Sequence, residues 1–337
     1  MAGTIMDTNP LPPAHSEPEA TTPELVTPSP PVPSLIVQPR RENPLLEIFV
    51  GPNGLYPGTR WLIYLAMGGI LLGLFGTFMH FAHRQHGGPI WWGLVTQIGV
   101  TLAAILPAFV MARIEKRPFG AFGLPKQNAF RRNFWVGTLW GIVSLSVLMI
   151  ALRLAGAFEF GSLSIHGWQV AKFAVYYALF FLTVGFFEEF LVRGYSQWVL
   201  SRGMHFWPTA ALLSAGFGAL HSSNPGESKA GLIAAALIGF FFCLTLRRTG
   251  DLWWAIGFHM SWDWGESYLY SVPDSGGMMP GHLLNSSFHG PNWLTGGSVG
   301  PEGSLLVFVV ILALWVVFDR MYPEVKYGIN SSQDLCS

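Results

Sequence analysis

Phe186-Phe187-Glu188-Glu189-Phe190-Leu191-Val192-Arg193 places two carboxylates and one guanidinium inside an otherwise apolar stretch, residues 168–200. A charged side chain inside a bilayer costs about 3 kcal/mol or more, so such groups are either compensated or functional. Glu189 and Arg193 are four residues apart with the acid first, the favourable orientation for an ion pair on a helix. Glu188 lies about 100° round the same helix. We therefore predict that Glu189 and Arg193 form a structural ion pair and that Glu188 is a catalytic residue. The alternative is that all three charged side chains form a structural polar cluster between helices.

The composition is that of a membrane protein. Of the 337 residues, 51% are hydrophobic and 11% are charged, whereas soluble domains carry about 25% charged residues. The predicted fold class is all-α, a polytopic membrane protein with about eight transmembrane helices in one bundle. The formal net charge is zero, which argues against nucleic acid as a partner.

The chain divides into four predicted regions. Residues 1–43 are rich in Pro, Ser and Thr and are expected to form a disordered cytoplasmic tail. Residues 44–60 are expected to form an interfacial segment, with a short helix near residues 45–50. The transmembrane helical domain covers residues 61–322, and residues 323–337 form a short cytoplasmic tail. Runs long enough to cross about 30 Å of hydrocarbon occupy residues 61–82, 90–112, 134–157, 168–200, 207–221, 231–246, 252–270 and 305–322.

The distribution of basic residues predicts the orientation. Lys and Arg gather at alternate ends of these segments, most densely in residues 113–132. The positive-inside rule then places both termini in the cytoplasm, which requires an even number of spans. We expect an integral protein of the bacterial inner membrane, with the lipid bilayer as its surroundings.

Two further polar intrusions interrupt the apolar segments. Phe217-x-x-x-His221 ends the fifth span, and His259-x-x-x-Asp263 lies in the seventh, where the four-residue spacing puts both side chains on one helical face. A carboxylate beside an imidazole can deprotonate a water, and a second imidazole can donate an N–H to the oxyanion at a scissile carbonyl. Glu188, His221, His259 and Asp263 are therefore the predicted catalytic residues. The alternative for either His alone is a helix–helix contact.

Together, Glu188-Glu189-x-x-x-Arg193 and the two His motifs resemble the CPBP family of intramembrane proteases, also called the CAAX protease or Abi family. The resemblance covers roughly residues 168–270, the predicted protease core. It implies hydrolysis of a peptide bond in a membrane-embedded or membrane-associated protein, with prenylated CaaX proteins among the candidate substrates. It also implies that Glu188 and His221 activate the water, that His259 and position 263 form the oxyanion site, and that Glu189 and Arg193 are a structural pair.

Asp263 departs from the family pattern, in which Asn is common at this position. An ionised Asp cannot donate to an oxyanion, so Asp263 must be protonated, orient His259 through Nδ1, or bind a metal. Glu188, His221, His259 and Asp263 would be an adequate zinc ligand set. The sequence lacks the His-Glu-x-x-His spacing of familiar zinc proteases, so we expect no cofactor and keep zinc as the alternative.

The long connection 271–304 contains no Lys or Arg and is rich in Gly, Pro, His and Asn. It is expected to fold onto the outer ends of the helices. Glu266, His282 and His289 are expected to lie too far outward to reach the site, in capping or surface roles. Competing functions are a transporter that uses the buried charges, and a non-catalytic membrane scaffold or immunity protein.

Overall fold

A computed structural model describes residues 49–51, 54–86 and 91–328, with side chains omitted for 83–86. Contacts divide the chain into two units, Met1–Asn43 and Pro44–Ser337. The first unit lies outside the described residues, as do residues 329–337, so the predicted disorder of the tail stays a prediction. Everything below concerns the second unit.

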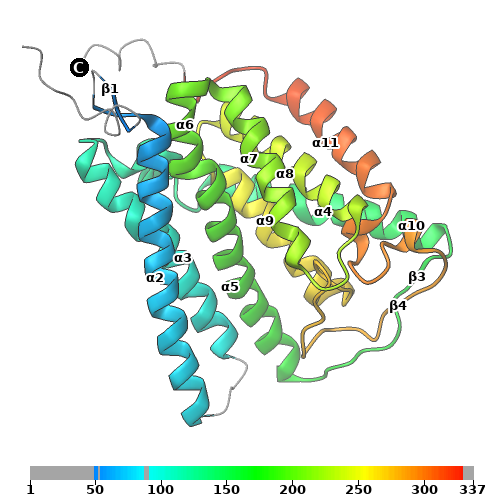
Figure 1. The fold of residues 1–337 in the computed structure, drawn as a ribbon. Helices are drawn as coiled ribbons and strands as arrows, with labels where there is room; N and C mark the ends of the chain where they lie inside the picture. The colour runs from blue at the N-terminus through cyan, green and yellow to red at the C-terminus, as the bar shows by residue number, and fades with distance from the viewer. Residues whose placement is uncertain (1–48, 52–53, 87–90, 329–337) are drawn as a thin grey trace, which may run out of the picture. The chain divides into compact units, whose positions relative to one another are not determined.

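Helices dominate this unit, in agreement with the predicted fold class (Figure 1). The helices are α2 (Pro57–His86), α3 (Trp91–Ile114), α4 (Arg132–Leu154), α5 (Trp168–Leu191), α6 (Gln197–Met204), α7 (Phe206–Leu220), α8 (Lys229–Thr249), α9 (Trp253–Trp264), α10 (Asn292–Thr295) and α11 (Leu306–Met321). Two π-helical segments, η3 (Val192–Ser196) and η5 (Gly265–Tyr270), continue α5 and α9. Short 3₁₀ turns are η1 (Phe119–Phe122), η2 (Lys126–Asn128), η4 (His221–Ser223) and η6 (Pro301–Gly303).

The strands are two short antiparallel pairs. Near the start of the described chain, β1 (Val50–Gly51) pairs with β2 (Gly54–Leu55). Phe49 is therefore in a turn and Val50 in a strand, rather than in the interfacial helix predicted near residues 45–50; residues 45–48 lie outside the described part. The other pair joins β3 (Phe158–Glu159) to β4 (Ser287–Phe288) and so ties the long loop to the end of α4.

Five helical segments are long and apolar enough to cross a membrane: Pro57–Ala82, Trp91–Ile114, Arg132–Leu154, Trp168–Met204 and Lys229–Thr249. All eight predicted segments contain helix, but α7 has 15 residues, α9 has 12 and α11 has 16. At 1.5 Å per residue, even 16 residues cover only about 24 Å. The prediction of about eight full spans was thus only roughly right, because three of the helices are short.

α9 lies at the centre of the packing, against α4, α5 and α8. Its contact with α4 is backbone to backbone, because glycines lie where the two helices cross. A Cβ atom at Gly137 would be 2.0 Å from the carbonyl oxygen of Trp254, and one at Gly257 would be 2.2 Å from that of Phe134. Small residues of this kind let membrane helices approach closely. The close packing holds His259, nearly two turns from the start of α9, in the middle of the bundle.

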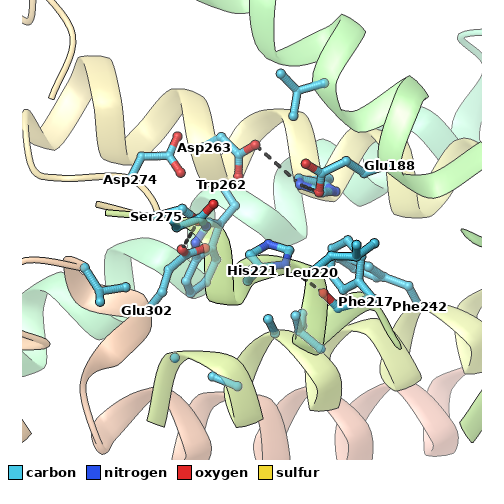
Figure 2. Close-up of a pocket in the computed structure, with 18 of the residues that line it drawn as sticks. Glu188, Phe217, Leu220, His221, Phe242, Trp262, Asp263, Asp274, Ser275 and Glu302 are labelled. Carbon is cyan, nitrogen blue, oxygen red and sulfur yellow. Dashed lines mark hydrogen bonds and ion pairs between the residues drawn. The ribbon is translucent and has the colours of Figure 1, made fainter. Parts of the chain in front are cut away.

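The loop 271–304 folds back over the helices, as the sequence predicts. Besides the β3–β4 pair, the Tyr177 hydroxyl on α5 donates to the carbonyl oxygen of Pro280 at 2.5 Å. The loop contains two charged residues, Asp274 and Glu302. Both point into the cavity described next rather than into solvent (Figure 2), so the loop supplies part of the site.

Candidate active site

A cavity of about 520 Å³ opens among α5, α7, α8, α9 and α11, with loop 271–304 forming part of its wall. Most of the lining side chains are aliphatic or aromatic. The ionisable ones are Glu188, His221, Glu227, His259, Asp263, Asp274 and Glu302. No Lys or Arg of the described residues is among them. All four predicted catalytic residues therefore face one cavity, whose walls are apolar and whose charged groups are acidic.

The two adjacent glutamates of α5 occupy different environments. The Glu188 side chain is 25% exposed and faces the cavity, whereas the Glu189 side chain is 0% exposed. One step along a helix turns the side chain by about 100°, which is sufficient to place one carboxylate in the cavity and the other inside the protein. Only Glu188 is accessible to a water or substrate there.

Glu189 connects Arg193 to His259. Its Oε2 accepts a hydrogen bond from Nη1 of Arg193 at 2.9 Å, and its Oε1 lies 2.9 Å from Nδ1 of His259. The buried guanidinium also donates to the Gly239 carbonyl oxygen at 3.1 Å, and it lies between aromatic rings of α7 and α8. The ion pair deduced from the sequence is present, and it also holds the ring of a catalytic candidate, a role that sequence reasoning missed.

Arg193 sits in the π-helical segment η3, where the chain departs from α-helical geometry. Gly194 has φ −81° and ψ −114°. The Ser196 hydroxyl donates to the Leu191 carbonyl oxygen at 2.6 Å, a side-chain bond that closes the irregular turn. π-bulges of this kind are frequent at functional sites. Here the bulge directly follows the two glutamates.

His259 presents Nε2 to two carboxylates. Nε2 is 3.5 Å from Oε2 of Glu188 and 3.4 Å from Oδ2 of Asp263. The hypothesis that Asp263 orients His259 through Nδ1 is therefore wrong, because Glu189 occupies Nδ1 and Asp263 faces Nε2. Both Nε2 distances exceed the usual 2.7–3.2 Å of an N–H···O bond, so this nitrogen has room to engage a further group.

His221 approaches the cavity from the end of α7. Its Nδ1 is 2.9 Å from the Phe217 carbonyl oxygen, so that Nδ1 carries the proton and Nε2 is left as an acceptor when the ring is neutral. No carboxylate of the described residues forms an ion pair with this ring. Figure 2 shows His221 and Glu188 on facing walls of the cavity, which leaves space between them for a water or a substrate group.

The acidic group contributed by loop 271–304 was missed by sequence reasoning. One ligand oxygen from each of Asp263, Asp274 and Glu302 lies within 4.8 Å of the others, and Figure 2 shows these carboxyls gathered on one side of the cavity. Burial, together with the neighbouring Glu302 carboxylate, raises the pKa of Asp274 to about 8. The available signal was that this long loop has two acidic residues and no Lys or Arg.

Three other residues had been expected in capping or surface roles. For Glu266 this expectation is wrong: it is 0% exposed, because η5 continues α9 and keeps this turn inside the protein. His282 is half-buried, with Nδ1 3.0 Å from the Met279 carbonyl oxygen. His289 is exposed and lies 3.8 Å from Glu159, as a surface residue should.

Comparison with known protein families gives a match over the segment from α5 to α9. The family model described as type II CAAX prenyl endopeptidase Rce1-like matches residues 169–265, which include the four predicted catalytic residues but not Asp274 or Glu302. No curated protein sequence matches the chain. The resemblance deduced from the three motifs is thus confirmed over residues 169–265, which are similar to the CPBP (CAAX protease) family.

Proposed function

We propose that this protein is an intramembrane endopeptidase that hydrolyses a peptide bond of a membrane-associated substrate with a water activated by Glu188 and His221. The observation that carries the proposal is the convergence of Glu188, His221 and His259, from three separate helices, on one largely apolar cavity. The family match supports a CAAX-type protease; the assignment of residues to steps is ours.

The first step is attack by water. A water held between Glu188 and Nε2 of His221 gives one proton to the Glu188 carboxylate as its oxygen bonds to the scissile carbonyl carbon. His221 is well suited to hold this water, since its Nδ1 is engaged by the Phe217 carbonyl oxygen and its Nε2 lone pair remains. The apolar walls exclude bulk water, which strengthens these polar interactions.

The second step is stabilisation and collapse of the tetrahedral intermediate. With Glu189 on Nδ1 and two carboxylates near Nε2, a doubly protonated His259 has an acceptor for each N–H. Nε2–H can turn to the oxyanion, an interaction of a type worth about 3 kcal/mol. In this step Asp263 assists by holding the His259 ring in place; it does not itself donate a hydrogen bond to the oxyanion. As the C–N bond breaks, the protonated Glu188 returns its proton to the leaving amine.

The substrate class follows from the cavity and the family. Apolar side chains of α5, α8 and α11 line most of the cavity, which suits a peptide that carries a lipid or lies in the bilayer. We propose prenylated proteins as candidate substrates, in a bacterial inner membrane with both termini in the cytoplasm.

The test is cleavage of matched prenylated and unprenylated peptides by the purified protein in liposomes. Wild type should cleave, and Glu188→Gln should not. The zinc alternative, with Glu188, His221, His259 and Asp263 as ligands, predicts stoichiometric zinc and loss of activity on zinc chelation, whereas the proposed mechanism predicts neither. Ion flux through the wild-type protein without any peptide cleavage would contradict the proposal and favour a transporter.

A further inference from the structure

We propose that Asp263, Asp274 and Glu302 form a binding site for a divalent cation that prefers oxygen ligands, such as Ca²⁺ or Mg²⁺. This inference goes beyond the proposed function and does not depend on it. The site would lie in the wall of the cavity, where loop 271–304 meets α9 (Figure 2). Its ligands come from two parts of the chain, so a bound cation would also join the loop to the helix.

The geometry of the three carboxylates suits such an ion. One oxygen from each lies within 4.8 Å of the others. Ligands of Ca²⁺ stand 2.3–2.6 Å from the ion, so opposite ligands are about 5 Å apart. Asp263 is buried, whereas Asp274 and Glu302 are half-buried, which leaves the ion open to the cavity for water ligands. With only oxygen donors, the site favours Ca²⁺, Mg²⁺ or Mn²⁺ over zinc.

The neighbouring groups neutralise only part of the charge of the cluster. The Ser267 hydroxyl donates to Asp274 at 3.1 Å, and the Ser275 hydroxyl donates to Glu302 at 2.7 Å. These bonds orient the two loop carboxylates but supply no positive charge. No Lys or Arg lines the cavity in the described part of the chain. The imidazole of His259 lies 3.4 Å from Asp263, but it also faces Glu188 and Glu189, so its charge cannot balance that of three clustered carboxylates.

Glu266 provides a second and independent observation. It is 0% exposed, and neither carboxylate oxygen has a hydrogen-bond partner among the described residues. It lies three residues after Asp263, in η5. The carboxylates of Glu302, Asp274 and Asp263 all act electrostatically on its carboxyl, so Glu266 lies beside the cluster. A buried carboxyl without partners is costly, and a cation in the cluster would offset that cost.

The test uses Tb³⁺, a luminescent substitute for Ca²⁺ that also takes oxygen ligands, on the full-length protein in a neutral detergent without substrate. Trp262 lines the same cavity and can sensitise the ion. Wild type should give saturable luminescence that Ca²⁺ displaces. Asp274→Asn and Glu302→Gln should each weaken Tb³⁺ binding about tenfold or more, because each removes one charged ligand. Glu227→Gln, which removes a cavity carboxylate outside the cluster, should change binding less than about twofold.

A thermal measurement separates lost binding from lost folding. Ca²⁺ should raise the unfolding temperature of wild type and Glu227→Gln, because a ligand that binds only the folded state stabilises it. It should not raise that of Asp274→Asn, although this variant unfolds cooperatively. Absence of saturable Tb³⁺ luminescence in wild type, or equal weakening in all three variants, would overturn the site. Neither result would bear on peptide cleavage, which is measured separately.

Discussion

The neighbouring residues Glu188 and Glu189 provide the most discriminating test of the site, because the same substitution should have opposite consequences at the two positions. Glu188→Gln removes the base that faces the cavity, while its one ionic contact among the described residues is the long one to His259 at 3.5 Å. Cleavage should fall by about 10²–10⁴-fold, with a change in the free energy of unfolding below about 1 kcal/mol.

Glu189→Gln should instead destabilise the fold. Both Glu189 and Arg193 have side chains that are 0% exposed, and their atoms are 2.9 Å apart. Removing the charge leaves the guanidinium buried without this counter-ion, beside the Gly239 carbonyl oxygen and two aromatic rings. Breaking a buried pair in this way costs about 3–5 kcal/mol. For a protein of this size the unfolding temperature should then fall by on the order of 10 °C.

The two readouts are cleavage of a fluorogenic peptide in liposomes and thermal unfolding followed by tryptophan fluorescence. Glu227→Gln, in the same cavity but outside the proposed mechanism, serves as the control and should match wild type in both. A Glu188→Gln protein that cleaves at the wild-type rate would refute the assignment of the base. A Glu189→Gln protein that unfolds at the wild-type temperature would show that the Arg193 pair does not support the bundle.

Three further predictions concern the proposed water site, the central packing and a buried acid. His221→Asn should lower cleavage by about 10²-fold or more with little change in unfolding temperature; activity near wild type would exclude this His from water activation. Gly257→Ala would place a methyl group 2.2 Å from a backbone oxygen of α4 and should cost about 1–3 kcal/mol of unfolding free energy, whereas Gly216→Ala, where space is open, should cost nothing. Asp251, between α8 and α9, has its pKa raised above 3.8 by burial. Its folded form therefore holds the proton more tightly than the unfolded form, so the stability of wild type relative to Asp251→Asn should fall as pH rises from about 4 through the raised pKa; a pH-independent difference in melting temperature would contradict this.

Much of the core of the site could be predicted because its signals are local. A charge within an apolar run is visible in the sequence, and a spacing of four residues puts two side chains on one helical face whatever surrounds them. On this basis Glu188, His221, His259 and Asp263 could be selected, and in the structure all four line one cavity. Helical periodicity likewise separates Glu188 from Glu189.

Contacts between distant segments could not be predicted in the same way. The sequence alone determined a helical membrane protein with ionisable side chains at Glu188, His221 and His259 inside apolar segments, since hydropathy and spacing are properties of single segments. Tertiary structure decided that Glu189 holds Nδ1 of His259 and that Asp274 and Glu302 fold back into the cavity. It also left α7, α9 and α11 too short to span by themselves. The physical reason is that side-chain partners and burial depend on how helices cross and loops fold back, which no local pattern encodes.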